Sequence, residues 1–354
     1  MSHSPTRIPL TLATLALACM GALPLRASAA DSSNLLQSGR FCSATGASLL
    51  DACRHAAQDA FFRAQAACIN LDGVAAAECA ARAERRRAQR EHFCGAQSDA
   101  RAGLCAAIGE ARYQPGFDPA DFQRDFHHPS PPNPYGPLVP GDRWRYKGQH
   151  QDDEITVLDA TKLIAGVECV VVHDVVREGG VAIEDTEDWE ALRNDGAVYY
   201  CGESSLDYAT FAGDQPMRPE LITISGSFKT GRHGDLPGLL VPIAPVVGAV
   251  YRQEFSPGNA EDAARILSVD YAYGRDAELD RDVPPALAQL LCAAGDCLVT
   301  EEFSPLEPRA DERKYYARGI GMFLTVDLVA GTAQPLVQCN MDPRCDGLAA
   351  LAGR

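Results

Sequence analysis

Three carboxylates that lie close together in the chain are the side chains best placed to do chemistry. Asp174, Asp185 and Glu187 fall on two expected strands joined by Gly179 and Gly180, and paired glycines are typical of a two-residue hairpin loop. With that loop, Asp174 lies opposite Asp185, and all three acids point to one face of the sheet. Like charges in direct opposition destabilise a sheet, so a basic partner, a bound cation or a raised pKa must relieve the repulsion.

The neighbours of these acids lead to the hypothesis of a binding site. Apolar residues and Trp189 share the expected face, and Arg252 or Lys314 could neutralise the acids. The sequence therefore predicts a ligand-binding site made of Asp174, Asp185, Glu187, Trp189 and Arg252. The alternative is an internal ion-pair network that holds no ligand, because an uncompensated carboxylate on a half-buried face is costly. The residues expected to face solvent on the opposite side are His173, Arg177, Glu184, Asp188 and Glu190.

The sequence contains no recognisable catalytic motif. It has no Gly-x-Ser-x-Gly elbow, His-Glu-x-x-His pair, P-loop, EF-hand loop or dinucleotide-binding fingerprint, so we name no catalytic residue, cofactor or metal. Three functions stay open. The first is an exported, non-enzymatic binding or carrier protein for a small apolar or cationic ligand. The second is a secreted hydrolase that uses the acidic cluster, and the third is a structural protein that contacts an envelope partner through its helices.

The cysteines near the N-terminus indicate the first element that must support such a site. Six of them, at positions 42, 53, 68, 79, 94 and 105, are separated by 11, 15, 11, 15 and 11 residues. Both flanks are rich in alanine and lack proline, and such steps keep cysteines on one helix face. A helical hairpin with nested disulfides Cys42–Cys105, Cys53–Cys94 and Cys68–Cys79 follows. Sequential pairing would have to span ~16 Å inside a helix, whereas a disulfide needs Cα atoms within about 7 Å.

Beyond the hairpin the pattern predicts an antiparallel sheet. Val, Ile, Tyr and Trp become frequent from residue 136, and turn sequences recur at short spacing. We expect an α+β fold, with the disulfide-stapled hairpin followed by a curved, mainly antiparallel, half-barrel-like sheet. The expected boundaries are a signal peptide at 1–29, the hairpin at 42–112, a Pro-rich linker at 113–135, the β domain at 136–331 and a Cys-containing tail at 332–354.

The remaining cysteines give two local pairs and one excluded pair. Close spacing favours the disulfides Cys292–Cys297 and Cys339–Cys345. Cys169 and Cys201 are expected to lie opposite Glu190, on either side of one central strand. Two strand spacings would place them ~9.5 Å apart, beyond the reach of a disulfide. We therefore predict that these two cysteines are not bonded to each other.

Composition and the N-terminus indicate where the protein acts. The chain has 354 residues and a net charge of −16, which argues against nucleic acid or an anionic membrane as a partner. Arg7, an apolar stretch and the small residues at 27–29 are typical of an export signal; lipoprotein processing at Cys19 is the alternative. Cleavage after Ala29 leaves twelve of the 13 cysteines, an even number that suits disulfides in an oxidising compartment. We expect a periplasmic or extracellular protein without a transmembrane segment, whose partner is a small molecule or an envelope protein.

Several segments together resemble a family of uncharacterised exported bacterial proteins. They are CINLDGVAAAEC (68–79), YQPGFDPADF (113–122), NPYGPLVPGDRWRYKG (133–148), DTEDWEALRNDGAVYYCGE (185–203), YRQEFSPGNAED (251–262), LVTEEFSPLEP (298–308) and KYYARGIGMF (314–323). The chain departs from this family at Cys201, at Phe228 and in residues 276–297, which look like an insertion. The family has no established activity, so the resemblance implies no catalytic residue. The opening Gly-x-x-Trp-x-Tyr at 141–146 is also similar to exported half-barrel proteins that hold lipids or lipoproteins, a likeness of fold alone.

Overall fold

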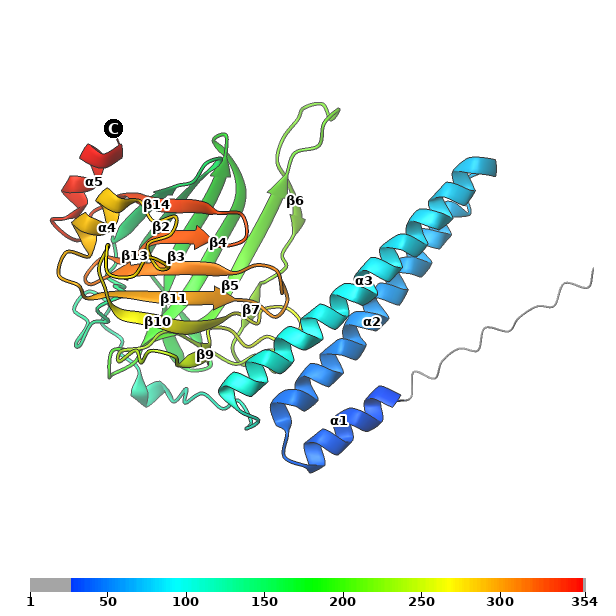
Figure 1. The fold of residues 1–354 in the computed structure, drawn as a ribbon, viewed down its shortest axis with the longest axis horizontal. Helices are drawn as coiled ribbons and strands as arrows, with labels where there is room; N and C mark the ends of the chain where they lie inside the picture. Colours follow the sequence, from blue (N-terminus) through cyan, green and yellow to red (C-terminus); the bar gives the residue numbers. More distant parts are fainter. Residues whose placement is uncertain (1–26, 353–354) are drawn as a thin grey trace, which may run out of the picture.

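The computed structural model describes residues 27–352 and has the α+β architecture that the sequence predicts (Figure 1). A disulfide-linked helical hairpin is followed by one large antiparallel sheet. Most of the expected signal peptide and the alternative lipid-attachment residue Cys19 lie outside the described residues. The expected cleavage site at 27–29 falls in the first turn of helix α1, Ala27–Gln37. No helix in this range is long and apolar enough to cross a membrane.

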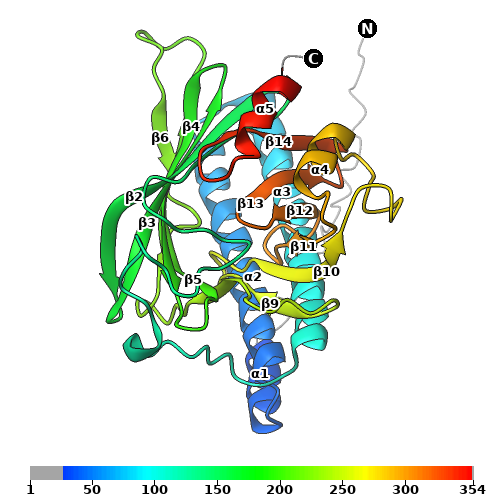
Figure 2. The ribbon, with the colours of Figure 1, turned by 90° about the vertical axis from the view of Figure 1, so that its left-hand side faces the viewer.

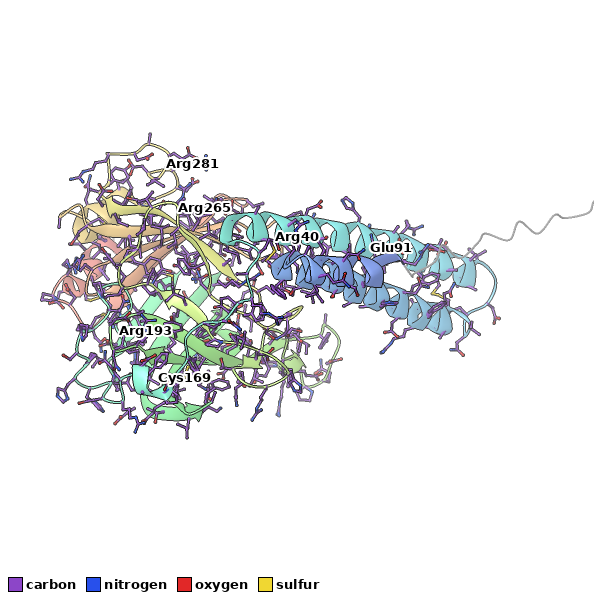
Figure 3. The ribbon with its side chains drawn as sticks, turned by 90° about the horizontal axis from the view of Figure 1, so that it is seen from below. Arg40, Glu91, Cys169, Arg193, Arg265 and Arg281 are labelled. Atoms are coloured by element: carbon purple, nitrogen blue, oxygen red, sulfur yellow. A yellow bond between two sulfur atoms is a disulfide. The ribbon has the colours of Figure 1, made fainter. Side chains whose placement is uncertain are left out.

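The hairpin forms as the cysteine spacing predicts. Its helices are α2 Phe41–Cys68 and α3 Gly73–Ile108, and the shorter α1 precedes them. The three nested disulfides are Cys42–Cys105, Cys53–Cys94 and Cys68–Cys79, with Cα separations of 5.6, 5.7 and 5.6 Å. Because the cysteines of each helix share one face, the bonds join α2 to α3 along their whole length, and the hairpin projects from the sheet (Figure 3). Its tip exposes Ile69 and Val74 to 82% and 75%.

The sheet runs in one continuous order from β6 through β5, β4, β3, β2, β1, β14, β13, β12, β11 and β10 to β9. The first eight strands are β1 Arg143–Lys147, β2 Gln151–Ile164, β3 Val167–Glu178, β4 Val181–Leu192, β5 Val198–Ala209, β6 Glu220–Thr223, β7 Phe228–Lys229 and β8 Gly238–Val241. The others are β9 Val250–Arg252, β10 Ala263–Tyr271, β11 Cys297–Phe303, β12 Glu312–Ala317, β13 Gly321–Asp327 and β14 Thr332–Cys339. The short helices are η1 Pro119–Asp121, α4 Pro285–Leu291 and α5 Cys345–Ala352.

The two halves of this sheet face each other. In Figure 2 the green strands β2 to β6 form one layer, and the yellow to red strands β9 to β14 form a second layer opposite it. Pairing of β1 with β14 joins the layers on one side. On the other side the bridge between Leu236 and Phe255 links them. There Gly238 lies so close to the backbone of Gln253 that a Cβ would be 1.7 Å from the Gln253 carbonyl oxygen, so this approach requires glycine.

The expectation that residues 332–354 form a tail outside the β domain is wrong for the first part of this range, which forms β14. Residues 332–339 form a strand between β1 and β13, and the strand includes Pro335. A proline interior to a sheet is found where the ladder is interrupted, and here the β1–β14 register shifts between Arg145 and Tyr146. The expected local disulfides are confirmed, with Cys339–Cys345 holding α5 to the end of β14 and Cys292–Cys297 joining α4 to β11.

The expected register of β3 and β4 is wrong by one residue. The two-residue loop Gly179-Gly180 is present, but a bulge follows it, and Asp174 pairs with Thr186 rather than with Asp185. A one-residue slip exchanges the two faces of a strand. Asp185 and Glu187 therefore lie on the opposite face from Asp174, and the expected arrangement of three acids on one face does not form.

A second bulge corrects the prediction that Cys169 and Cys201 are unbonded. These cysteines form a disulfide, with Cα atoms 6.8 Å apart. The register of β4 and β5 shifts between Trp189 and Glu190, which leaves Cys201 as an extra residue in β5. A bulge bends its strand and increases the local twist, so the flat-sheet spacing used for the prediction does not apply. Strand β4 lies between the two strands that carry these cysteines. Its residue Ala191 is small and fully buried.

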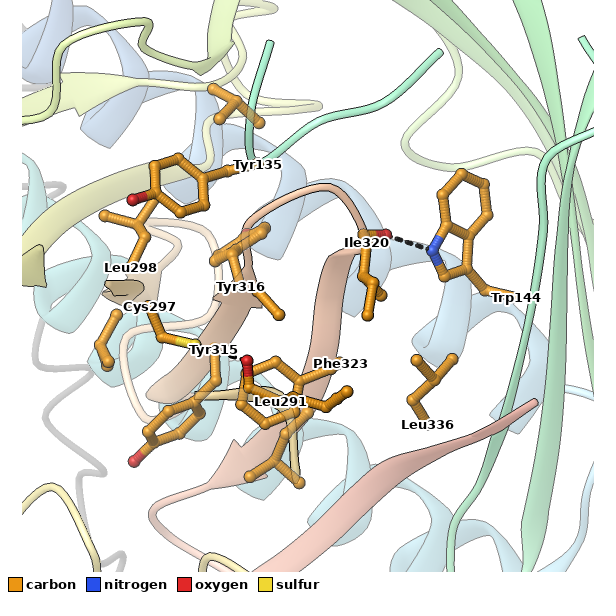
Figure 4. Packing of buried hydrophobic residues seen from close by; sticks show 14 of the residues in the cluster. Tyr135, Trp144, Leu291, Cys297, Leu298, Tyr315, Tyr316, Ile320, Phe323 and Leu336 are labelled. Atoms are coloured by element: carbon orange, nitrogen blue, oxygen red, sulfur yellow. Dashed lines mark hydrogen bonds between the residues drawn. The ribbon is translucent and has the colours of Figure 1, made fainter. Parts of the chain in front are cut away.

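The main hydrophobic core extends over the C-terminal layer and under α4 and α5. Figure 4 shows Tyr315, Phe323 and Leu291 packed together. In the same view the indole N–H of Trp144 donates to the carbonyl of Ile320 at 2.6 Å. This bond holds the indole ring of Trp144, on β1, against the turn that precedes β13.

The base of the hairpin is held to the sheet by a buried ion pair. Arg101 on α3 donates from Nε and Nη2 to the two carboxylate oxygens of Glu261 at 2.8 and 2.9 Å. The two side chains are only 6% and 4% exposed. Gln97, one helical turn earlier, donates to the carbonyl of Leu306 at 2.8 Å. Since a bidentate arginine–carboxylate pair fixes both distance and orientation, this contact orients the hairpin.

We predict that Glu261→Gln lowers the free energy of unfolding by about 3–5 kcal/mol, because it leaves a buried guanidinium without its counter-charge. Urea denaturation monitored by circular dichroism measures the change. Glu84→Gln is the matched control, because Glu84 pairs with Arg87 on the exposed part of the same helix; it should leave the urea midpoint unchanged. Equal stabilities of the two variants would contradict this role for Glu261.

Candidate functional site

The two layers of the sheet enclose a cavity of about 300 Å³. Its walls combine aromatic and aliphatic side chains with carboxyl groups. The aromatic residues are Tyr135, Trp144, Tyr146, Tyr200 and Tyr316, and the acids are Asp174, Asp188, Glu190, Glu254, Asp262 and Glu302. Of the described residues that line it, Lys314 is the one basic residue. A neighbouring hollow of about 510 Å³ shares Glu254, Asp262, Glu302 and Lys314 and adds further acids, Glu184, Glu203, Asp207, Glu307 and Glu312.

The first bulge determines which acids reach this cavity. Val172 pairs with Asp188 and Val170 pairs with Glu190, and paired residues of neighbouring strands point to the same face. Asp174 follows Val172 on that face by the two-residue period of a strand. On the inner face, valines of β3 therefore lie beside the acids of β4, and Asp174 adds a carboxyl group from β3.

Lys314 is already neutralised by Glu302. Its Nζ lies 2.7 Å from Glu302 Oε2. Glu302 Oε1 accepts hydrogen bonds from Tyr316 at 2.7 Å and from Thr300 at 3.0 Å. Burial opposes the ionisation of Glu302, but Lys314 and these hydrogen bonds outweigh it and lower its pKa. Of the acids that line the cavity, Glu302 is the one with an ion-pair partner among the described residues.

The other acids lack such compensation, and their pKa values rise. Burial raises the pKa of Glu190 to about 8, with a further contribution from Asp188. Burial also raises the pKa of Asp188 to about 6, although Tyr200 donates a hydrogen bond to its carboxylate. The pKa values of Asp174 and Glu254 are raised well above the usual range, mainly by burial and then by neighbouring acids. Near neutral pH the empty cavity therefore keeps several protons on its carboxyl groups.

Asp174 lies beside a second buried acid, Asp153. Among the described residues Oδ1 of each has no partner other than the opposing carboxyl group. Burial raises the pKa of Asp174 most, and repulsion by Asp153 and a hydrogen bond between the two carboxyl groups raise it further. Buried polar atoms are normally satisfied by the protein, by water or by a ligand. A positively charged group that donates hydrogen bonds would satisfy both oxygens and reduce the repulsion.

The structure separates the five residues that the sequence placed in one site. Asp174 alone of them lines the cavity. On the outer face, Asp185 Oδ1 lies 2.8 Å from His173 Nε2, and Glu187 is exposed. Trp189 is also on that face, where the ammonium groups of Lys162 and Lys229 lie 3.7 and 4.5 Å from its ring centroid.

Arg252 does not contact these acids. It is buried at the end of β9, near the base of the hairpin, and borders a separate pocket. The residues that the sequence reasoning missed are Asp188 and Glu190, which were expected in solvent, together with Glu254, Asp262 and Glu302. The alternation of Asp188 and Glu190 along β4 is visible in the sequence. The bulge that turns these two side chains inward has no local sequence signal.

The walls of the cavity combine carboxyl groups with aromatic rings. Within residues 27–352 no three His, Cys, Asp or Glu side chains are arranged to hold a metal ion. The aromatic rings at the wall offer π faces, which attract organic cations. No protein-family model, curated protein or solved structure matches the chain.

We predict that stability falls as the pH rises from about 4 to about 8. A carboxyl whose pKa is higher in the folded state than in the unfolded state, where it is about 4, stabilises the fold at low pH and loses this contribution as the pH approaches its folded value. The pH window is set by the pKa of Asp188, about 6, and the pKa of Glu190, about 8. Glu190→Gln should flatten the slope and raise stability at about pH 8 by at least about 1 kcal/mol.

Urea denaturation at several pH values between about 5 and 8 tests this linkage. Glu187→Gln is the matched control on the outer face of the same strand and should keep the wild-type slope. A wild-type profile that rises through this window, or a Glu190→Gln profile identical to it, would show that Glu190 is ionised in the folded protein.

Proposed function

We propose that this is an exported, non-enzymatic binding or carrier protein for a small organic cation with an apolar or aromatic body. The observation that carries the proposal is the excess of acids in an aromatic-walled cavity where Lys314 is already paired with Glu302. A cationic head among Asp174, Asp188 and Glu190 would supply the missing counter-charge. Its apolar body would lie against Trp144 and the neighbouring aliphatic residues.

The size and walls of the cavity support a small ligand. Its volume of about 300 Å³ is at the lower end of the range for ligand pockets, which are mostly apolar with a few placed polar groups. A desolvated cation over an aromatic ring gains about 2 kcal/mol. Ionic attraction inside a cavity is also stronger than in water, because less solvent screens it.

Export is part of the proposal and rests on the cysteines. Twelve of the 13 cysteines form six disulfides. Such bonds form and persist in oxidising compartments such as the periplasm or the extracellular space. The basic and apolar character of the first 25 residues is consistent with a signal that directs the chain there.

Isothermal titration calorimetry with 3-phenylpropylamine tests the proposed ligand class, with 3-phenylpropanol as the uncharged analogue. The amine should bind and the alcohol should not. Affinity for the amine should rise between about pH 6 and 8, because the carboxyls lose their protons in this range while an aliphatic amine stays charged. Binding should release protons, which repeating the titration in buffers of different ionisation enthalpy measures.

Two pairs of variants locate this binding. Asp188→Asn and Glu190→Gln, in the cavity, should each weaken amine binding about tenfold or more. Asp185→Asn and Glu187→Gln, on the outer face of the same strand, should leave it unchanged. Equal losses in both pairs would indicate attraction to the net charge of −16 rather than a site, and no heat of binding up to about 1 mM amine would refute the proposed ligand class.

A secreted hydrolase is the second candidate, favoured by the different pKa values of two acids in one cavity. Glu190 holds its proton to about pH 8, whereas the pKa of Glu302 is lowered. A protonated acid and an ionised one in the same cavity are the groups that general acid–base hydrolysis uses. A panel of chromogenic glycosides and esters tests this candidate. Turnover that is lost in Glu190→Gln would support hydrolysis. If no compound of the panel is turned over, binding is the function that the cavity supports.

A further inference from the structure

A second pocket lies where the hairpin meets the sheet, outside the acidic cavity. Its volume is about 360 Å³. Its lining comes from α2, the end of α3, residues 109–115 and the strands β5, β8 and β9; the residues used below are Phe41, Thr45, Arg112, Tyr113, Arg252 and Phe255. The nested disulfide Cys42–Cys105 fixes the helical wall, so the pocket is formed by rigid elements on both sides.

The charge of this pocket is opposite to that of the cavity. Among the described residues that line it are two arginines, Arg112 and Arg252, and no aspartate or glutamate. Arg112 is exposed at the rim, with its guanidinium carbon 4.0 Å from the ring centroid of Phe41. The lining is thus basic in a chain whose net charge is −16.

Arg252 is the central group. It is 9% exposed, and its Nε has no hydrogen-bond partner within the described part of the chain. Its Nη2 contacts the disulfide sulfur of Cys42 at 3.6 Å, which is a weak acceptor. Glu261, the acid that attracts it, already accepts hydrogen bonds from Nε and Nη2 of Arg101. A buried guanidinium normally has a carboxylate or phosphate partner, because it is costly to leave one unpaired.

The walls around Arg252 are aromatic. The guanidinium carbon lies 5.3 Å from the ring centroid of Phe255 and 5.9 Å from that of Tyr113. The Tyr113 hydroxyl donates to the Pro237 carbonyl at 2.9 Å, so it is not free to serve as a counter-group. The pocket therefore combines a fixed cation at its wall with flat apolar surfaces.

We propose that this pocket binds a small organic anion, with its carboxylate or phosphate on Arg252 and its apolar body between Phe41, Tyr113 and Phe255. Arg112 at the rim closes over the head group. The guanidinium fork matches the two oxygens of either anion. This site is independent of the acidic cavity, and it supplies the partner that Arg252 Nε lacks.

A purely structural role for Arg252 makes a different prediction. If Arg252 only braces the hairpin through its aromatic contacts, Arg252→Met should destabilise the protein, and no anion should affect its melting. If Arg252 serves a ligand, Arg252→Met should leave the empty protein at least as stable as wild type, because the variant removes an unpaired buried charge.

The test uses three probes that share a phenyl body on the full-length mature protein. They are 3-phenylpropionate, 2-phenylethyl phosphate and 3-phenylpropylamine, measured by calorimetry and by thermal shift up to about 1 mM. Either or both anions should bind and raise the melting temperature. The carboxylate and phosphate titrations tell which head group the pocket prefers. Binding of the amine should be the same in the wild type and in the Arg252 variants.

Four variants locate the anion. Arg252→Met should weaken anion binding about tenfold or more, and Arg252→Lys should retain part of it. Thr45→Trp fills the pocket from α2 without removing a charge and should also abolish binding. Arg265→Met is the matched control, because Arg265 lies on the neighbouring strand, pairs with Glu301 and is 42% exposed.

Three results would overturn the proposal. They are no binding of either anion to the wild type, equal binding to wild type and Arg252→Met, and full binding to Thr45→Trp. If Arg252→Met fails to fold, Arg252→Lys and Thr45→Trp still decide the question, because one keeps the charge and the other keeps the arginine. A loss of anion binding with unchanged amine binding would also separate this site from the acidic cavity.

Discussion

The ion pair between Lys314 and Glu302 sets the charge of the cavity on which the proposed function depends. It satisfies one acid with the single basic residue that lines the cavity in the described part of the chain, and it leaves Asp174, Asp188 and Glu190 without a counter-charge. Ionising each of these acids away from water costs free energy. This cost is the main physical cause of their raised pKa values. Near neutral pH the empty protein therefore keeps protons on Asp174 and Glu190. A cation that enters replaces those protons, so ligand charge and pH act on the same groups.

The elements could be predicted from the sequence because local patterns encode them. Cysteine steps of 11 and 15 residues on alanine-rich helices determine the nested hairpin. Alternation and glycine turns locate the strands, and the Gly179-Gly180 loop is where the sequence placed it. These features depend on residues close together in the chain. The placement of side chains across the sheet depends instead on how the two layers pack.

The faces could not be predicted, because bulges decide them. One bulge after the Gly179-Gly180 loop turned Asp188 and Glu190 inward, and it separated Asp174 from Asp185. A second bulge brought Cys201 within bonding distance of Cys169. A bulge adds one residue to one strand without requiring a particular side chain. Its position follows from the curvature that lets the layers close around the cavity, which is a property of the whole sheet.

A third irregularity explains why Arg252 does not neutralise the acids as the sequence suggested. The amides of both Gln253 and Glu254 donate to the carbonyl of Asp262, at 2.8 and 3.1 Å. Two donors on one acceptor interrupt the alternation there, so Gln253 and Glu254 both line the cavity while Arg252 borders the pocket under the hairpin. An uninterrupted strand would have put Arg252 and Glu254 on one face, where they could pair. Their separation leaves an unpaired acid on one side of the sheet and an unpaired cation on the other. The two sites of opposite charge therefore have a common origin in the local geometry that follows β9.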